Sequence, residues 1–381
     1  MNRFLASLLL ASCFLTTTGA NCTSTIFPAL GTNLSAPIAI SVDAANARAY
    51  VVNSNNRVEF NGASLSILDI SSPAAPTLLS NTSNPITIDN FSGQIYVDTT
   101  NRFAYIANRL STDPLDTSDV LLKVNLDESS SSLATITSNT AGNNPFGVAC
   151  CDASDRVYAV SSGGTVEVYN KLTLAYTQVS LAVTLDEGAI SGASATEAAF
   201  NSTGTLAFIS NRAGQVYILN TSEIGDASKN PIDYVIKNVQ DARGLALDAT
   251  NLYVVDGTAG TALLRVIPTA TLTPITPDTT AISQPDATTL QTTTVPLGND
   301  PNEIILFGGK AYVSNRGDDT ISVIDLSNLS ATPTTIAVGD EPYGLAAFTS
   351  GADSFLYVTN LASNTISVIN LASNTVVATF P

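Results

Sequence analysis

The hydrophobic residues of this chain fall in short runs rich in β-branched side chains, separated by clusters of Asn, Asp, Gly and Ser. At intervals an aromatic residue begins such a run, and the run usually closes on Asn. These aromatic positions lie 45 to 59 residues apart and are Tyr50, Tyr105, Tyr158, Phe208, Tyr253, Tyr312 and Tyr357. A period of about 40 to 50 residues with several short strands in each unit is typical of propeller blades. The pattern therefore predicts seven repeats of one small β unit.

The last two repeats show most clearly what one unit contains. Unit seven offers four strand candidates, at residues 341–348, 356–360, 365–370 and 375–380, and unit six matches it. The candidates are rich in Val, Ile, Thr and Tyr, which favour strands, and the Asn, Asp, Gly and Ser between them favour turns. Apolar residues occupy both faces, as expected for a sheet packed between two others. We predict an all-β fold, a seven-bladed β-propeller of four-stranded antiparallel blades over residues 35–381.

The C-terminal repeats carry specific motifs. These are the run Tyr357-Val-Thr-Asn360, the run Asn-Thr-Ile-Ser-Val-Ile at 364–369, and the connector Val338-Gly-Asp-Glu-Pro-Tyr-Gly344. Together they resemble the YVTN family of β-propeller repeats, specifically over residues 299–381 and in degenerate form over 35–265. That family is similar to surface-layer and archaeal cell-surface propellers and, in fold, to the haem domain of cytochrome d1. The resemblance implies a propeller fold and an extracytoplasmic setting but no single activity, because function resides in sites and not in folds.

The N-terminus has the pattern of an export signal. Arg3 precedes an apolar run over residues 4–15, and small residues then allow cleavage after Ala20, so residues 1–20 are predicted to be a signal peptide. The run is too short to span a bilayer as a permanent helix. Cys13 lies in a lipobox-like sequence and Cys22 is the alternative acylation site, so plain secretion and a lipid anchor both stay open. Residues 21–34 are either a tether or a strand that closes the ring.

Composition narrows the classes of function. Only 12% of the residues are charged, the net charge is −17, and the chain contains no His, no Trp and one Met, the initiator. An acidic surface repels phosphate backbones, which argues against nucleic-acid partners. Without His or an internal Met, haem ligation, Ser-His-Asp catalysis and His-based zinc sites are excluded. The low content of charged residues is common in secreted β-proteins. Together with the export signal it predicts an extracytoplasmic protein, in the periplasm, on the outer-membrane surface or secreted, with no transmembrane span.

Two local features bear on cofactors and covalent structure. Cys150 and Cys151 are adjacent at the end of the first strand of unit three. The plainer interpretation is two strand residues, one buried and one exposed, and the alternative is a vicinal disulfide, which an oxidising compartment permits. The Asp-rich stretch at residues 113–119 offers oxygen ligands without the regular order of an EF-hand loop. Calcium is therefore the one metal that this stretch leaves open, and no other cofactor is expected.

The connectors that lead into the first strand of each unit are the place to search for a ligand site, because those strands line the central channel of a propeller. Alignment on the aromatic positions places five candidate residues there. They are Glu197, Arg243, Asn302, Glu303 and Tyr343. Two carboxylates and an arginine around a channel mouth can bind a cation or position a hydrated ligand. The plainer interpretation is an ion pair between Glu303 and Arg243 with no ligand.

A second set of residues recurs in alternate units. Arg109, Arg212 and Arg316 each follow the Asn that closes the second strand of units two, four and six. They are predicted to project from one face of the ring, where they can bind an anion or an acidic partner. The plainer interpretation is that they are solvated or pair with nearby Asp residues, while the Asn caps the hairpin turn. The Thr/Pro-rich stretch at residues 267–298 is predicted to be an insertion between units five and six, either an extended surface loop or an elongated outer hairpin.

These features favour a non-enzymatic binding or scaffold module of the cell envelope that recognises an envelope protein or a surface polymer through one rim of the ring. The lack of common catalytic residue types and the export signal both support this hypothesis. The alternative is a lactonase-like hydrolase that uses a metal held by Glu197, Glu303 and Asn302 at the channel rim. A third hypothesis, self-assembly into a surface layer, predicts oligomers that depend on concentration.

Overall fold

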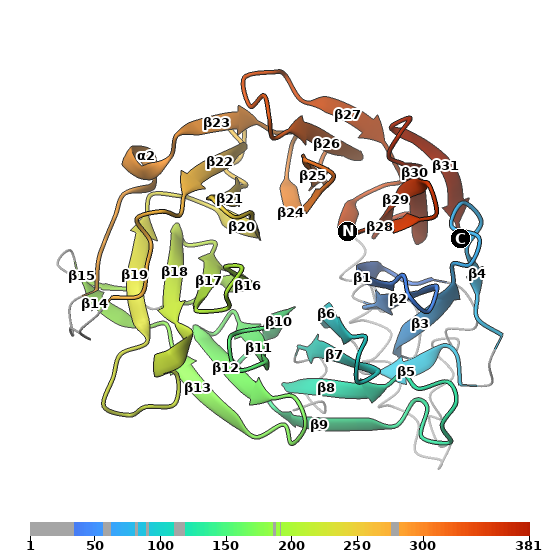
Figure 1. The fold of residues 1–381 in the computed structure, drawn as a ribbon, viewed down its shortest axis with the longest axis horizontal. Helices are drawn as coiled ribbons and strands as arrows, with labels where there is room; N and C mark the ends of the chain where they lie inside the picture. Colours follow the sequence, from blue (N-terminus) through green and yellow to red (C-terminus); the bar gives the residue numbers. More distant parts are fainter. Residues whose placement is uncertain are drawn as a thin grey trace, which may run out of the picture.

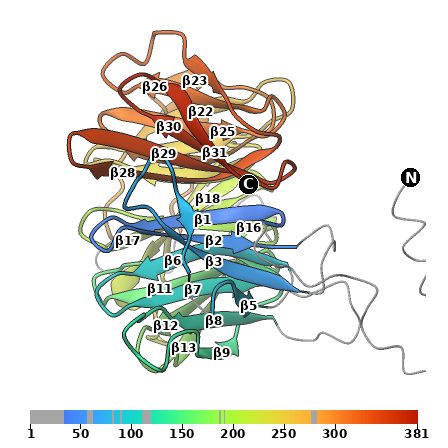
Figure 2. The same ribbon diagram turned by 90° about the vertical axis from the view of Figure 1, so that its right-hand side faces the viewer.

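The computed structural model describes residues 34–55, 62–80, 83–88, 91–109, 119–185, 188–190, 192–275 and 282–381. These residues form seven antiparallel sheets arranged as a ring, with the first strand of each sheet nearest the axis (Figure 1). Figure 2 shows the ring from the side, where successive sheets lie one against the next. The predicted seven-bladed propeller of four-stranded antiparallel blades is therefore confirmed.

Each blade takes its four strands in chain order from the axis outward. Blade one contains β1 (Pro37–Asp43), β2 (Arg48–Asn53), β3 (Ala63–Asp69) and β4 (Thr77–Leu78), with β5 (Ile86–Ile88) paired to β3. Blade two contains β6 (Ser92–Asp98), β7 (Phe103–Asn108), β8 (Val120–Asn125) and β9 (Ile136–Thr140). Blade three contains β10 (Pro145–Ala149), β11 (Arg156–Ser161), β12 (Thr165–Asn170) and β13 (Tyr176–Ser180).

The later blades follow the same order. Blade four contains β16 (Ala195–Phe200), β17 (Leu206–Asn211), β18 (Gln215–Asn220) and β19 (Ile232–Lys237). Blade five contains β20 (Ala242–Leu247), β21 (Asn251–Asp256), β22 (Leu263–Pro268) and β23 (Thr293–Pro296). Blade six contains β24 (Pro301–Phe307), β25 (Lys310–Asn315), β26 (Thr320–Asp325) and β27 (Thr334–Ala337), and blade seven contains β28 (Pro342–Ser350), β29 (Asp353–Asn360), β30 (Thr365–Asn370) and β31 (Thr375–Phe380). Outside the blades lie the hairpin of β14 (Val183–Leu185) and β15 (Gly188–Ile190), the 3₁₀ turn η1 (Thr221–Glu223) and the short helix α2 (Ala287–Leu290).

The seven aromatic residues explain why the repeat is so regular. Each lies in the second strand of its blade and is almost completely buried. Each belongs to a hydrophobic cluster formed with the following blade, including the cluster in which Tyr357 of blade seven meets blade one. One large ring per interface buries much apolar area at a small entropic cost. The aromatic residue is therefore a large buried side chain that recurs at each interface between neighbouring blades.

The residue that closes the second strand forms a buried polar pair with the third strand. In blades one, six and seven an Asn amide donates to a Ser hydroxyl, with distances of 2.9 Å for Asn53–Ser66, 2.9 Å for Asn315–Ser322 and 3.0 Å for Asn360–Ser367. Blade five carries Asp256 and Arg265 at the same register positions, 2.7 Å apart. In blade three, Ser161 donates to Glu167 at 2.9 Å. Three different pairs thus satisfy the same two buried positions.

The ring closes where blade seven meets blade one. The fourth strand of blade seven is β31, next to the C-terminus, and β1 packs against β28. Across this boundary the Tyr357 hydroxyl donates to the backbone oxygen of Pro73 at 2.7 Å. The predicted signal peptide, the acylation sites Cys13 and Cys22, and the predicted tether or closing strand lie outside the described residues, except for Leu34. In the part of the chain that is described, no helix is long and apolar enough to cross a membrane.

The Thr/Pro-rich stretch forms an elongated outer hairpin, one of its two predicted forms, but its predicted place between units is wrong. It connects β22 to β23 inside blade five, and not blade five to blade six. Its described part runs along the outer strand of blade four, where Val235 donates to Ser283 and Lys237 donates to Pro285, both at 2.9 Å. These contacts satisfy backbone groups on an outer strand that would otherwise be a free sheet edge. Propensity alone cannot reveal this role, because the pairing partner lies in another repeat.

The plainer interpretation of the two adjacent cysteines is wrong. Cys150 and Cys151 follow β10, which ends at Ala149, and both are half-buried. They are joined to each other by a disulfide bond. The alternation of one buried and one exposed residue fails here because the strand has already ended and the chain has entered the turn before β11.

Candidate functional site at the channel mouth

A cavity of about 260 Å³ lies at the end of the ring where the first strands of the blades begin. Blades two to seven all contribute to its wall. Its charged and aromatic lining residues are Arg109, Phe146, Glu197, Arg212, Arg243 and Tyr343. Such convergence of several blades on one point is the usual way in which a ring of this kind builds a ligand site.

A repeated backbone turn brings the arginines to this rim. In blades two, four and six, the residue before the first strand has a positive φ of 62°, 79° and 48° respectively. The carbonyl of that residue accepts a hydrogen bond from the backbone N–H of the arginine that follows the second strand. The distances are 3.3 Å for Arg109 to Phe91, 3.1 Å for Arg212 to Ser194 and 3.0 Å for Arg316 to Asp300. Each arginine is therefore tied to the start of the innermost strand.

The first strands alternate around the channel in a way that extends the arginine pattern. At the third position of the strand, blades two, four and six carry Gln94, Glu197 and Glu303, whereas blades three, five and seven carry Gly147, Gly244 and Gly344. The glycines are required by close approach between blades, since a Cβ at residue 244 would lie 2.6 Å from the backbone oxygen of Asn302. Longer polar side chains and glycines thus alternate between neighbouring blades in the channel wall. The blades with the polar side chains are the same blades, two, four and six, that carry the rim arginines.

The two channel carboxyl groups favour their neutral forms. Burial raises the pKa of Glu197 well above its ordinary value, and the nearby Glu303 raises it further. Burial raises the pKa of Glu303 to about 8, against a hydrogen bond from the backbone of Leu345 that lowers it. Both residues are half-buried, and Glu197 lines the cavity. At neutral pH the pair therefore adds little negative charge to the cavity.

Three of the four arginines at the mouth share a network with three carboxylates. Asp241 and Asp300 each bridge two arginines, because Asp300 also contacts Arg243. The other ion pairs are Arg212–Asp241 at 2.8 Å, Arg243–Asp241 at 2.7 Å, Arg316–Asp300 at 3.4 Å and Arg316–Glu341 at 3.3 Å. This network holds the arginine heads in place, and among the described residues the Arg109 guanidinium is the one at the mouth that it does not include.

Arg109 differs from the other three arginines. Its Nε donates to the backbone oxygen of Phe91 at 3.2 Å, and its guanidinium lies 5.0 Å from the centre of the Phe146 ring. Among the described residues, no carboxylate lies within ion-pair distance of it, and burial lowers its pKa. The Nε of Arg316 is also buried without a hydrogen-bond partner in the described structure. Some guanidinium donors at the mouth are therefore not satisfied by any of the residues that the structure describes.

An aromatic pair crosses the channel beneath these arginines. Phe146 of blade three meets Tyr343 of blade seven edge to face, with ring centres 6.0 Å apart. The Arg316 guanidinium lies over the Tyr343 ring, 5.5 Å from its centre, and the Arg109 guanidinium lies over the Phe146 ring in the same way, at 5.0 Å. Stacking of this kind holds a guanidinium in one orientation while its N–H edge stays available.

The structure brings the two predicted sets of residues into one site. Glu197, Arg243, Asn302 and Tyr343 line the cavity together with Arg109 and Arg212, and Arg316 stacks on Tyr343. Glu303 occupies the same strand position as Glu197 two blades on and interacts with it. The expected ion pair between Glu303 and Arg243 is wrong, because Arg243 pairs with Asp241 and Asp300 instead. Pairing of arginines with nearby Asp residues is confirmed for Arg212 and Arg316.

Several lining residues were not selected from the sequence. Phe146 and Thr196 stand in the aligned connectors, whereas Ser162 and Ser194 carry no signal of their own. The register of the first strands would have found Gln94, since it is the counterpart of Glu197 and Glu303. The Asp-rich stretch considered for calcium lies outside the described residues, except for Asp119.

The described residues offer little for a metal ion at the mouth. Their one cluster of three Cys, Asp or Glu ligand atoms is Cys150, Cys151 and Asp155, and its two sulfur atoms are disulfide-bonded. The oxygen ligands considered for a metal, from Glu197, Glu303 and Asn302, stand among arginines. Carboxyl groups that favour protonation and lie near guanidinium groups suit an anion better than a cation.

Comparisons with known proteins identify the fold alone. No protein-family model matches the chain, and no curated protein matches it. Among solved structures, it is similar to Kuenenia stuttgartiensis hydrazine synthase, with a TM-score of 0.66 and 13% identity over 93% of this chain and 99% of that chain. It is also similar to the β-propeller domain of Myceliophteria thermophila Cps50 (Swd1), with a TM-score of 0.62 and 10% identity over 88% of this chain and 98% of the other.

A third similar structure is the computationally designed Ika8 protein, with a TM-score of 0.56 and 10% identity over 93% of this chain and 89% of that chain. At such identities the likeness carries no information on ligand or activity. By its own sheet topology and by these comparisons, the chain is a seven-bladed β-propeller.

Proposed function

We propose that this protein is an exported, non-enzymatic β-propeller of the cell envelope. It binds an envelope protein or a surface polymer, and the channel mouth binds a carboxylate group of that partner. The observation that carries the proposal is the Arg109 guanidinium, which faces the cavity and has no carboxylate partner among the described residues. A partly buried charge is normally paired, because leaving it unpaired costs free energy. A planar guanidinium with free N–H groups matches the two oxygens of a carboxylate.

The size of the cavity supports recognition of one group and not of a whole molecule. Its volume of about 260 Å³ is near the lower end of small-molecule sites, which span roughly 300–1,000 Å³. One acidic side chain or one acidic sugar fits such a space, while the rest of a protein or polymer stays outside the ring. Neutral donors around it, among them Ser162, Ser194 and Asn302, suit the hydroxyl or amide groups next to a carboxylate.

The acidic character of the whole chain is compatible with this ligand. The net charge of −17 opposes the approach of an anion from a distance. At physiological ionic strength that repulsion is screened beyond about 8 Å. The charges near the mouth then determine binding, and among the described residues four arginines lie there with the three carboxylates of the ion-pair network. The site should therefore bind weakly at very low salt concentration, where long-range repulsion is strongest.

We also propose that the chain is a divergent member of the YVTN-type repeat group in an extracytoplasmic setting. The motifs of residues 299–381 support this assignment, as does the hydrogen bond from the motif Asn to a Ser in blades one, six and seven. The lactonase-like alternative has less support. It requires a cation at Glu197, Glu303 and Asn302, in surroundings that favour an anion.

Replacing Arg109 with Gln tests the proposed function. We expect the variant to lose affinity for a small carboxylate by at least tenfold, about 1.4 kcal/mol, because a charged hydrogen-bond donor is removed. Isothermal titration calorimetry with glucuronate and with a short glutamate-containing peptide measures the effect. Preference for glucuronate favours a surface polymer as partner, and preference for the peptide favours a protein.

The matched control removes the same charge elsewhere. Lys310 begins β25 at the opposite rim, so Lys310→Gln changes the net charge equally without touching the cavity. Its affinity should equal that of the unmodified protein. If neither carboxylate binds the unmodified protein, or if Arg109→Gln binds as tightly, then the proposed recognition of a carboxylate is wrong.

The affinity should also depend on pH through the channel carboxyl groups. Burial raises the pKa of Glu303 to about 8, so this group is neutral below that pH and negatively charged above it. Because the added charge repels an anion, affinity should fall as the pH rises through about 8. Glucuronate remains ionised throughout, so the change belongs to the protein. Calorimetry at pH 6.5 and 9 should show the fall, and Glu303→Gln should largely remove it.

A further inference from the structure

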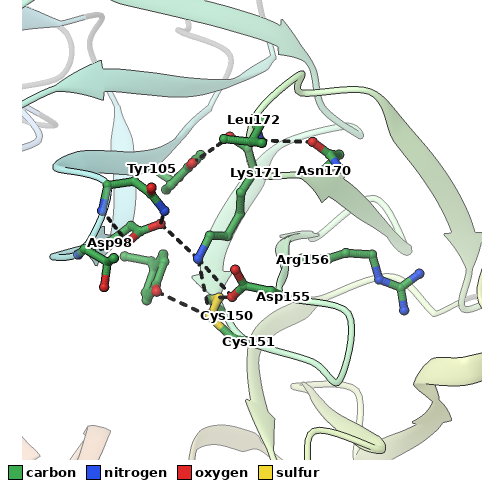
Figure 3. Close-up of polar contacts among 12 residues, drawn as sticks. Asp98, Tyr105, Cys150, Cys151, Asp155, Arg156, Asn170, Lys171 and Leu172 are labelled. Carbon is green, nitrogen blue, oxygen red and sulfur yellow. Dashed lines mark hydrogen bonds and ion pairs between the residues drawn. A yellow bond between two sulfur atoms is a disulfide. The ribbon is translucent and has the colours of Figure 1, made fainter.

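A second cluster of reactive groups lies at the other end of β10 from the channel mouth. Pro145 begins this strand beside the cavity, and the disulfide-bonded pair Cys150–Cys151 follows its far end. Figure 3 shows the side chain of Lys171 reaching toward the disulfide from the turn after β12, with carboxylates of blades two and three beside it. Nothing in the channel-mouth site shares a residue with this cluster.

Lys171 is held with its ammonium group next to one of the two sulfur atoms. Its Nζ lies 2.9 Å from Asp98 and 2.9 Å from Asp155, and 4.0 Å from the Sγ of Cys151. Burial lowers the pKa of Lys171, but the hydrogen bonds to the two carboxylates outweigh it and raise the pKa, so the ammonium group stays charged. The Tyr96 hydroxyl lies 3.3 Å from the same sulfur atom.

The turn that carries Lys171 is anchored by blade two. The Nζ of Lys123 donates to the backbone oxygen of Lys171 at 2.8 Å and to that of Leu172 at 3.0 Å. The Tyr105 hydroxyl donates to the Lys171 oxygen as well, at 2.8 Å. Two buried side chains thus fix the backbone of this turn, while the ammonium group is held by the buried Asp98 and by the largely exposed Asp155.

We infer that Cys150–Cys151 is a thiol–disulfide exchange site, in which a small thiol attacks Cys150 and Cys151 leaves as a thiolate stabilised by Lys171 and Tyr96. The asymmetry of the surroundings supports this direction. The positive Nζ and a hydroxyl donor face Cys151, whereas Cys150 has the carboxylate of Asp155 at 4.0 Å from its sulfur. A leaving thiolate departs faster when neighbouring groups stabilise its charge.

The exchange balances with two molecules of a monothiol. The first thiolate forms a bond to Cys150 Sγ, the Cys150–Cys151 bond breaks, and its electron pair stays on Cys151 Sγ. A second thiolate attacks the outer sulfur of the mixed disulfide, and the electron pair of that bond leaves on Cys150. The products are the disulfide of the small thiol and two protein thiols, which take up the two protons lost when the attacking thiols ionised. Two electrons pass from the small thiol to the protein.

Reduction kinetics of the full-length chain test the inference. The probe is 2-mercaptoethanol, and the readout is alkylation of Cys150 and Cys151 by iodoacetamide, followed by mass spectrometry of the peptide ending at Arg156. Lys171→Met should slow reduction about tenfold, which corresponds to about 1.4 kcal/mol. Asp155→Asn should accelerate it, because a negative charge beside the attacked sulfur is removed and Lys171 loses a competing partner.

The opposite directions of these two effects separate chemistry from stability. Loss of either ion pair can loosen this turn, and loosening would speed reduction in both variants. Slower reduction of Lys171→Met therefore cannot result from local unfolding. Lys310→Met, which removes a distant charge, should react as the unmodified protein does. Equal or faster reduction of folded Lys171→Met would overturn the inference, as would free thiols at both positions in the untreated protein.

Discussion

Asp256→Asn is expected to lower the free energy of unfolding by about 3 kcal/mol. Asp256 is 1% exposed and forms an ion pair with Arg265, itself 6% exposed, at 2.7 Å. After the substitution the guanidinium keeps the side-chain oxygen of Gln291 at 2.7 Å as an acceptor but loses its counter-charge. An unpaired buried charge costs far more than an exposed one, because it has lost its hydration without compensation. Urea unfolding followed by circular dichroism measures the loss.

The double variant Asp256→Asn, Arg265→Ser should be more stable than Asp256→Asn alone. It places in blade five the Asn–Ser pair of blades one, six and seven, and Val254 faces residue 265 just as Val313 faces Ser322 in blade six. The two substitutions are thus expected to be strongly non-additive, as they are for residues in direct contact. A double variant that lost the sum of the two single effects would show that the pair is not an equivalent of the Asn–Ser pair.

Gly147→Ala is expected to cost about 3 kcal/mol, the upper end of the range for overpacking. A Cβ at this position would collide with the backbone oxygen of Thr196 and lie 3.1 Å from the Cα of Glu197. These are backbone atoms of the next blade, so they cannot rotate away as a side chain can. Blades three and four would have to separate, and because both line the channel mouth, carboxylate binding should weaken as well.

A second glycine provides the comparison for this prediction. A Cβ at Gly62 would meet its nearest atom, Cγ2 of Thr87, at 3.8 Å, an ordinary contact distance. Gly62→Ala should therefore change the free energy of unfolding by less than about 1 kcal/mol. Thermal unfolding of both variants under one set of conditions decides the matter. Equal losses of unfolding free energy in the two variants would mean that β10 and β16 can move apart without destabilising the ring, and the prediction would then be wrong.

The repeat could be read from the sequence because it depends on local patterns. Each blade needs an aromatic residue for its interface, β-branched residues for its strands and polar residues for its turns, and these requirements recur at the same spacing. The Asn that closes the second strand is local too, since its partner Ser lies seven residues later in blades six and seven. Features of this kind survive degeneration of individual repeats, so even the weaker units centred on Tyr158 and Tyr253 were correctly placed.

The partners of charged groups could not be read in the same way. Arg243 pairs with Asp241, two residues away, and with Asp300, which lies in the next blade. From the sequence, Glu303 is the expected partner of Arg243. Glu303 and Asp300 lie close together in the sequence, at the start of the first strand of blade six. Strand pleating and the close approach permitted by Gly244 decide which carboxyl group reaches the guanidinium.

The sequence by itself determined the blade number, the strand order and the placement of polar residues at the starts of the first strands, because these follow from short-range patterns repeated seven times. Only the tertiary structure decided that two separate sets of candidates form one cavity, that Arg109 has no carboxylate partner among the described residues, and that Lys171 lies beside Cys151. These outcomes depend on which blades face one another across the ring and across each interface. That geometry arises only when the ring closes and brings residues from different repeats to one place.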